Sequence, residues 1–136
     1  MTTVAFIGLG NMGGPMAANL AKAGYAVRGF DLVPFLREEA AKAGISVAAS
    51  AAESVKDADV VVTMLPAGKH VITVWSEIAP LAKQGALFID SSTIDVDSAR
   101  AAHALAAKAG LASVDAPVSG GTGGAKGATL TFMCGG

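Results

Sequence analysis

The chain has 136 residues, of which 52% are hydrophobic and 15% charged, which is enough for one ordinary core and too little for a second domain of similar size. Its formal net charge of -1 argues against a surface for nucleic acid or an anionic membrane. No apolar run reaches the roughly 18 residues of a membrane span, and the N-terminus lacks the features of a secretory signal. We therefore expect no nucleic-acid or membrane partner and a cytoplasmic location, or the mitochondrial matrix in a eukaryote.

Short β-branched runs alternate with alanine-rich stretches through the first half of the chain, and glycine or proline stands at most of the boundaries. This alternation is typical of βαβ units on a parallel sheet. Gly24 and Gly44 are stop signals for two helices, and Ser50 with Glu53 has the spacing of a capping box. We expect strands at 4–7, 25–31, 45–48 and 60–64, and helices up to residue 23, over 34–43 and up to residue 56.

The second half continues the alternation and ends in a glycine-rich region. We expect helices over 71–82 and 95–108, strands at 86–89, 111–114 and 129–134, and a glycine-rich connection over 120–127. Trp75 is interpreted as a core or interface residue and not as a stacking platform, and the lone Cys134 as a buried, inert thiol in the last strand. The pattern predicts an α/β protein with a doubly wound, mostly parallel sheet, in one domain over 1–136.

A glycine pattern follows the first expected strand and opens the first expected helix. Gly8, Gly10 and Gly13 have the GxGxxG spacing, which in this position is typical of a Rossmann-type dinucleotide site. The first glycine permits a tight turn, the second lets a diphosphate approach the backbone, and the third lets the helix pack closely on the sheet. Free amides at the helix start bind the anion. The residues expected to contact the cofactor here are Gly8, Leu9, Gly10, Asn11, Met12 and Gly13.

Asp31 stands at the end of the second expected strand, where a carboxylate can accept hydrogen bonds from the adenosine ribose of a dinucleotide. A 2′-phosphate would meet like charge there, and no Arg or Lys follows immediately. Arg37, further along, is interpreted as a solvated charge on a helix face. The sequence therefore predicts NAD, and not NADP, as the cofactor.

Four segments of the chain carry a longer signature. They are residues 6–20 around the glycine pattern, Met64-Leu65-Pro66, Asp90-Ser91-Ser92-Thr93, and Asp115-Ala116-Pro117-Val118-Ser119-Gly120-Gly121. Together they resemble the β-hydroxyacid dehydrogenase family, and its 3-hydroxyisobutyrate dehydrogenases most closely, over the whole chain. Each segment follows the carboxyl end of an expected strand, which is where open α/β sheets bind ligands.

The resemblance implies NAD-dependent oxidation of a 3-hydroxy acid, such as 3-hydroxyisobutyrate to methylmalonate semialdehyde, with no metal. At the matching positions it implies that Leu65 and Pro66 line the cofactor and that Thr93 lies near the nicotinamide. His70 stands where relatives often have an Asn that contacts the cofactor. The same likeness assigns the substrate carboxylate to Ser119, Gly120 and Gly121.

The resemblance also implies a general-base lysine in an all-helical second domain, which these residues do not include. Lys126, the lysine nearest the substrate loop, is interpreted as a solvated charge. We therefore expect the chain to bind NAD without turning over substrate. Its uncovered apolar surface predicts a homo-oligomer.

Two alternatives remain open from the sequence. The chain could belong to an NADPH-dependent semialdehyde, glyoxylate or imine reductase of the same superfamily, although these often have a basic residue after the second strand. It could instead be a non-catalytic dinucleotide-binding module, against which the Ser119 to Gly121 loop argues.

Overall fold

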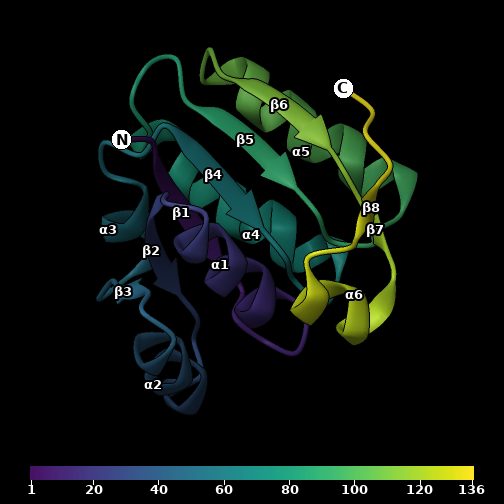
Figure 1. Ribbon diagram of the computed structural model, residues 1–136. Helices are drawn as coiled ribbons and strands as arrows, with labels where there is room; N and C mark the ends of the chain where they lie inside the picture. The colour runs from purple at the N-terminus through teal and green to yellow at the C-terminus, as the bar shows by residue number, and fades with distance from the viewer.

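A parallel sheet of six strands forms the centre of the computed structural model, which describes residues 1–136 (Figure 1). The strand order is β3-β2-β1-β4-β5-β6, and every neighbouring pair in this sheet is parallel. The predicted doubly wound sheet is thereby confirmed. The six strands are β1 (Thr3–Ile7), β2 (Ala26–Phe30), β3 (Ser46–Val47), β4 (Val60–Thr63), β5 (Leu87–Asp90) and β6 (Ala112–Asp115).

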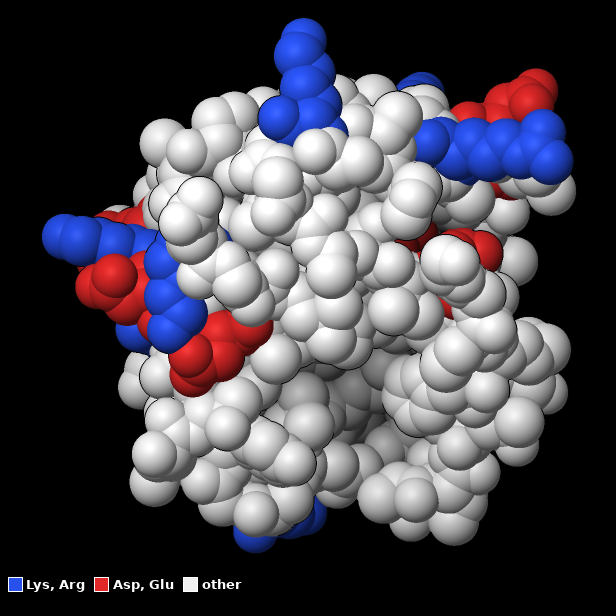
Figure 2. Space-filling view, turned by 90° about the horizontal axis from the view of Figure 1, so that it is seen from above, with Lys and Arg blue, Asp and Glu red and all other residues white.

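Helices cover both faces of the sheet (Figure 1). One face carries α1 (Gly13–Lys22) and α2 (Pro34–Lys42), and the other carries α3 (Ala51–Val55), α4 (Gly68–Ile78) and α5 (Val96–Lys108). No helix combines the length and the apolar character that crossing a membrane requires. On the face shown in Figure 2, acidic and basic side chains lie next to one another, and a hollow has an uncharged rim.

Successive residues of β1 supply the two halves of the core, because neighbouring side chains of a strand point to opposite faces. Val4 and Phe6 pack in the cluster that includes α1 and α2. Ala5 and Ile7 pack in the cluster that includes α3, α4 and α5. Burial on both faces explains why the central strands are apolar without alternation.

Trp75 lies in the core between α4 and the sheet, as predicted, and is only 2% exposed. Its ring meets that of Phe88 edge to face, with centroids 5.1 Å apart and planes at 89°, a favoured aromatic geometry. Its indole N–H donates to the Thr63 hydroxyl at 3.1 Å. The largest side chain of the core is therefore also fixed by a polar contact to β4.

The fourth helix differs from its predicted range at both ends. It begins at Gly68, where a Cβ would overlap the Ser98 side chain, so the absence of a side chain lets the starts of α4 and α5 pack together. It ends at Ile78, and Pro80 falls in the short 3-10 turn η1 (Ala79–Leu81), because proline cannot donate the hydrogen bond that would continue the helix.

The C-terminal region differs most from its prediction. The glycine-rich stretch forms the helix α6 (Gly121–Gly127), and the expected strand over 129–134 shrinks to β8 (Thr131–Phe132), which pairs antiparallel with β7 (Val118–Ser119). The interpretation of Cys134 as buried was wrong, because its thiol is exposed. A two-residue ladder leaves Cys134 outside any strand that would cover it.

Candidate functional site

The carboxyl ends of β1 and β4 meet at the point where the chain changes direction across the sheet. From β1 the chain passes through α1 to β2 on one side, whereas β4 and β5 extend the sheet on the other side. Crevices at such switch points bind ligands in open α/β sheets. The glycine turn leaves β1 at this point, and Leu65 leaves β4 beside it.

Gly8 and Gly13 are required by close approaches within the turn. Gly8 has φ +101°, and a Cβ there would overlap the carbonyl oxygen of Met64 at the end of β4. A Cβ at Gly13 would overlap the carbonyl oxygen of Gly8. Gly10 differs, since a Cβ there would have no atom within 4 Å. Two glycines thus close the turn, and the third leaves open space above it.

The start of α1 presents free backbone donors to that space. The amides of Gly10, Asn11, Met12 and Gly13 donate to no backbone or side-chain acceptor in the chain. No side chain caps the helix, and its first turn contains no acid. Unpaired amides and the positive end of the helix dipole favour an anion. The glycine turn therefore fits the diphosphate of a dinucleotide.

Asp31 is held against the glycine turn. One carboxylate oxygen accepts from the Leu9 amide at 2.8 Å, and the other accepts from the Val33 amide at 2.9 Å. Each carboxylate oxygen can accept more than one hydrogen bond, so the half-buried side chain keeps capacity for ribose hydroxyls. The carboxylate that is expected to bind the ribose also orients the turn that is expected to bind the diphosphate.

Arg37 is not the solvated charge that its position suggested. Its guanidinium donates to the carbonyl oxygen of Asp31 at 2.6 Å and lies 5.7 Å from the centroid of the Phe30 ring. The interpretation was wrong because α2 places Arg37 over the end of β2, where both partners are available. Arg37 therefore braces the segment that carries Asp31.

Polar side chains missed by the sequence reasoning connect the ends of β4 and β5. The amide of Leu65 donates to the Ser92 hydroxyl at 2.7 Å. The hydroxyls of Ser92 and Thr63 donate to the same oxygen of Asp90, at 2.7 and 2.8 Å. Thr63 and Asp90 are paired in the β4–β5 register, so two polar residues ending adjacent apolar strands were the available signal.

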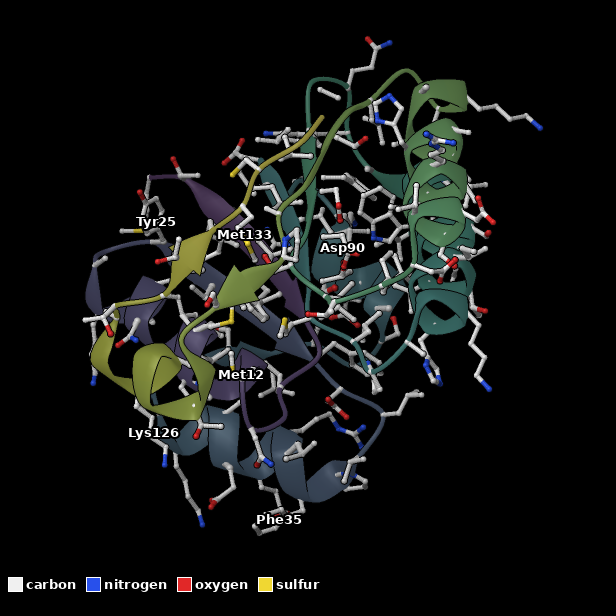
Figure 3. All side chains as sticks on the ribbon, turned by 90° about the vertical axis from the view of Figure 1, so that its right-hand side faces the viewer. Met12, Tyr25, Phe35, Asp90, Lys126 and Met133 are labelled. Carbon is white, nitrogen blue, oxygen red and sulfur yellow. The ribbon has the colours of Figure 1, made fainter.

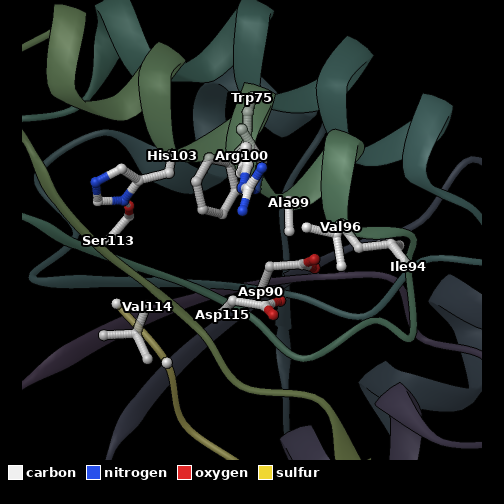
Figure 4. Close-up of a pocket in the computed structure, with 13 residues that line it drawn as sticks. Trp75, Asp90, Ile94, Val96, Ala99, Arg100, His103, Ser113, Val114 and Asp115 are labelled. Carbon is white, nitrogen blue, oxygen red and sulfur yellow. Dashed lines mark hydrogen bonds between the residues drawn. The ribbon is translucent and has the colours of Figure 1, made fainter.

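Asp90 and its register partner Asp115 lie side by side and line a cavity of about 380 Å³ between α5 and the end of the sheet (Figure 4). Burial raises the pKa of the Asp90 carboxyl, the Asp115 carboxyl raises it further, and hydrogen bonds from Ser92 and Thr63 oppose the shift. Burial also raises the pKa of Asp115. One oxygen of each carboxyl, Oδ2 of Asp90 and Oδ1 of Asp115, has no hydrogen-bond partner. These acids thus favour their protonated forms more than exposed acids do.

The remaining candidate residues lie at the same edge of the sheet. Pro66 follows β4, His70 lies in the first turn of α4, and Thr93 follows β5, all three exposed. The Ser119 to Gly121 loop follows β6, with all three residues exposed. Contacts join the glycine turn to Asp31 and Leu65, whereas no hydrogen bond joins the Ser119 loop to them directly.

The Ser119 loop is tied to the glycine turn through two helices. The helix α6, which follows this loop, packs on α1, where the Asn19 amide donates to the Ala125 carbonyl oxygen at 2.6 Å. Lys126 is an exposed residue of α6 (Figure 3), which agrees with its interpretation as a solvated charge. The α1–α6 contact fixes the Ser119 loop relative to the helix that begins at the glycine turn.

A helix start with free amides at the switch point of a sheet ordered 3-2-1-4-5-6 is the arrangement of dinucleotide-binding domains. Residues 3–136 match the family described as the NAD binding domain of 6-phosphogluconate dehydrogenase. The chain belongs to this family. The prediction of an NAD-binding, Rossmann-type domain is thereby confirmed.

Similar proteins of known name include hydroxy-acid dehydrogenases. The chain is 55% identical to the probable 3-hydroxyisobutyrate dehydrogenase of Mycobacterium tuberculosis over 136 residues, which are 100% of this chain and 46% of that protein. It is 51% identical to the NAD-dependent L-serine dehydrogenase of Pseudomonas aeruginosa over 143 aligned positions, which are 100% of this chain and 47% of that protein. The resemblance inferred from the sequence motifs is confirmed.

A solved structure agrees with these likenesses. The structure of Mycobacterium tuberculosis 3-hydroxyisobutyrate dehydrogenase with L-serine has a TM-score of 0.98 to this chain at 55% identity, and covers 100% of this chain and 47% of that one. The chain thus spans about half the length of the relatives that it matches.

Proposed function

We propose that this chain is the cofactor-binding part of an NAD-dependent dehydrogenase that oxidises a 3-hydroxy acid. The observation that carries the proposal is the set of unpaired amides at Gly10 to Gly13 beside the carboxylate of Asp31. In this arrangement the amides bind the diphosphate and Asp31 binds the adenosine ribose. The identity to 3-hydroxyisobutyrate and L-serine dehydrogenases supports the choice of reaction.

The surroundings of Asp31 favour NAD over NADP. A 2′-phosphate would be repelled by the carboxylate, and the guanidinium of Arg37 is engaged with the Asp31 carbonyl oxygen and the Phe30 ring. Leu32, Val33 and Pro34 supply no other positive charge. This arrangement argues against the alternative of an NADPH-dependent reductase.

The proposed substrate class is the one shared by the substrates in the names of two relatives, 3-hydroxyisobutyrate dehydrogenase and L-serine dehydrogenase. Both 3-hydroxyisobutyrate and L-serine have a carboxylate and a hydroxyl on the third carbon. The Ser119 to Gly121 loop is exposed at the sheet edge and offers a hydroxyl and unhindered amides, donors that suit a carboxylate. We assign the substrate carboxylate to this loop.

The residues of this chain bind and orient, and do not move the proton. Leu65 and Pro66 line the nicotinamide side of the site, with Thr93 beside it and His70 at the start of α4. A bound NAD supplies the hydride acceptor. Lys126, the lysine nearest the substrate loop in the sequence, is an exposed residue of α6, and we assign it no proton transfer. We therefore expect cofactor binding without substrate oxidation by this chain.

Calorimetric titration with NADH and NADPH tests the proposal. We expect NADH to bind at least about tenfold more tightly than NADPH, and Asp31→Asn to reduce that difference because it removes the repelling charge. Asp97→Asn, the same change at an exposed acid of α5, is the matched control and should change neither affinity. Failure of the unaltered protein to bind either dinucleotide at millimolar concentration would contradict the proposal.

A further inference from the structure

A continuous chain of hydrogen bonds runs behind Leu65 in the interior. It begins at the Trp75 indole, which donates to Thr63 at 3.1 Å, and continues from Thr63 to Asp90 at 2.8 Å. From the other end, Leu65 donates to Ser92 at 2.7 Å, and Ser92 donates to Asp90 at 2.7 Å. Thr63 and Ser92 are 0% exposed and Asp90 is 2% exposed, so water does not compete for these bonds.

The direction of every bond in this chain is determined by its ends. The Trp75 indole and the Leu65 amide can only donate. The hydroxyls of Thr63 and Ser92 each accept from one of these donors and give their single hydrogen to Asp90. The Ser92 amide also donates to that oxygen, at 3.2 Å. The oxygen Oδ1 of Asp90 is thus the common acceptor of three donors.

Leu65 depends on this chain because it lies just beyond the β4 ladder. The last parallel bond of β4 toward β1 is made by the Met64 amide to the Ile7 carbonyl oxygen at 3.0 Å. The next amide, that of Leu65, finds the Ser92 hydroxyl instead of a strand neighbour. A Cβ added at Gly8 would lie 3.1 Å from a methyl carbon of Leu65, so the Leu65 side chain packs beside the glycine turn. Leu65 therefore lies at the crevice beside the glycine turn, and its position affects the shape of the crevice there.

We propose that Asp90 is a positioning residue that fixes the Leu65 amide through Ser92 and thereby shapes the nicotinamide end of the cofactor site. The inference rests on the proposed function, in which Leu65 and Pro66 line that end. Asp90 lies in the interior behind the site (Figure 3) and contacts no ligand itself. The adenosine end is held separately by the contact between Leu9 and Asp31, so we expect loss of the Asp90 network to act mainly at the other end of the dinucleotide.

Two ligands separate the ends of the site in a binding experiment. NADH contains the nicotinamide, whereas ADP-ribose contains the adenosine, the diphosphate and both riboses without it. We expect Ser92→Ala and Asp90→Leu to weaken NADH binding about tenfold, the effect of losing one or two buried hydrogen bonds, and to leave ADP-ribose affinity within about twofold of the original. Asp90→Asn retains an acceptor oxygen and should restore the original NADH affinity.

Ser91→Ala is the matched control. Ser91 adjoins Ser92, is 0% exposed, and its hydroxyl has no hydrogen-bond partner, so its loss removes a buried hydroxyl without breaking the network. We expect no change in either affinity. Hydrogen exchange of the Leu65 amide gives a readout without ligand: it should be slow in the original protein and in Ser91→Ala, and fast in Ser92→Ala.

The outcomes distinguish the two proposals. Two results with Ser92→Ala would overturn the positioning role and leave the proposed function intact. One is an equal loss of affinity for NADH and ADP-ribose. The other is an unchanged NADH affinity together with slow hydrogen exchange of the Leu65 amide. If Asp90→Leu does not fold, the Ser92→Ala result decides. Failure of the original protein to bind both ligands would overturn the proposed function and this inference with it.

Discussion

At the scale of single residues, Gly10 and Gly13 separate the requirements of folding from those of binding. A Cβ at Gly13 would overlap the Gly8 carbonyl oxygen, whereas a Cβ at Gly10 would have no atom within 4 Å. We expect Gly13→Ala to lower the free energy of unfolding by about 2 kcal/mol, as overpacking does. Gly10→Ala should leave stability within about 0.5 kcal/mol and still abolish tight NADH binding. Urea denaturation and calorimetry measure the two effects, and loss of binding without loss of stability in Gly13→Ala would contradict this division.

The buried acids predict a pH dependence of stability. In the folded protein the pKa of Asp90 is raised above its ordinary value of 3.8. Burial is the main cause, and the neighbouring Asp115 carboxyl adds to it. A group with a raised folded pKa stabilises the protein below its unfolded pKa, and this contribution is lost as the pH rises through the folded value. Asp90→Asn removes this titration. We therefore expect the variant to gain stability relative to the original protein as the pH rises from 3.8 toward neutrality.

Urea denaturation at several pH values across that window measures the gain. Asp57→Asn, at an exposed residue, is the control and should show no such trend. A difference between Asp90→Asn and the original protein that stays constant with pH would show that burial does not perturb Asp90.

The sequence predicted the glycine turn and Asp31, because spacing along a strand, turn and helix determines their positions. The interpretation of Arg37 as a solvated charge was wrong, and the sequence predicted no contacts for Asp90. The partners of Arg37 are a carbonyl oxygen and a ring, which leave no charge pattern in the sequence. The partners of Asp90 come from β4 and from the residues after β5, and only the strand register brings them together.

At the scale of helices and strands, the capping interaction of α3 lies away from the expected ligand contacts. The Ser50 hydroxyl accepts from the Glu53 amide at 3.0 Å, as the capping-box spacing predicted. We expect Ser50→Ala to lower the free energy of unfolding by about 1 kcal/mol, measured by urea denaturation, with unchanged NADH affinity. Ser50→Asp, which retains an acceptor, should restore stability. An unchanged stability in Ser50→Ala would mean that the cap contributes nothing to α3.

The parallel sheet was predictable from β-branched runs between helical stretches, but the C-terminal elements were not. Six of the expected strands pair in one sheet, and burial on both faces selects apolar residues in its central strands. The helix α6 has the sequence GTGGAKG, which has low intrinsic helix propensity, so packing on α1 through Asn19 and Ala125 forms it. The strand predicted from the alternation over 129–134 is longer than the observed β8, because β7 offers only two residues for pairing.

At the scale of the whole molecule, uncovered apolar surface predicts self-association. A cavity of about 490 Å³ is lined mainly by apolar residues of the sheet, α1 and the C-terminal segment, including Leu20, Ile89, Leu130 and Phe132. Phe132 is 49% exposed. Apolar surface of this kind favours a protein partner over water. We expect a dimer or larger oligomer in analytical ultracentrifugation, weakened by Phe132→Ser.

Phe35→Ser is the control for this experiment. Phe35 is 63% exposed but lies on α2 and does not line the cavity, so its replacement should leave the sedimentation unchanged. A monodisperse monomer in the original protein would contradict the predicted self-association.

The central claim is that the start of α1 and Asp31 together hold NAD. A crystal structure of the protein soaked with NADH tests it most directly. We expect diphosphate oxygens within hydrogen-bond distance of the amides of Gly10 to Gly13, and adenosine ribose hydroxyls on the Asp31 carboxylate. A dinucleotide bound elsewhere, or a glycine turn whose amides remain without ligand at saturating NADH, would contradict the claim.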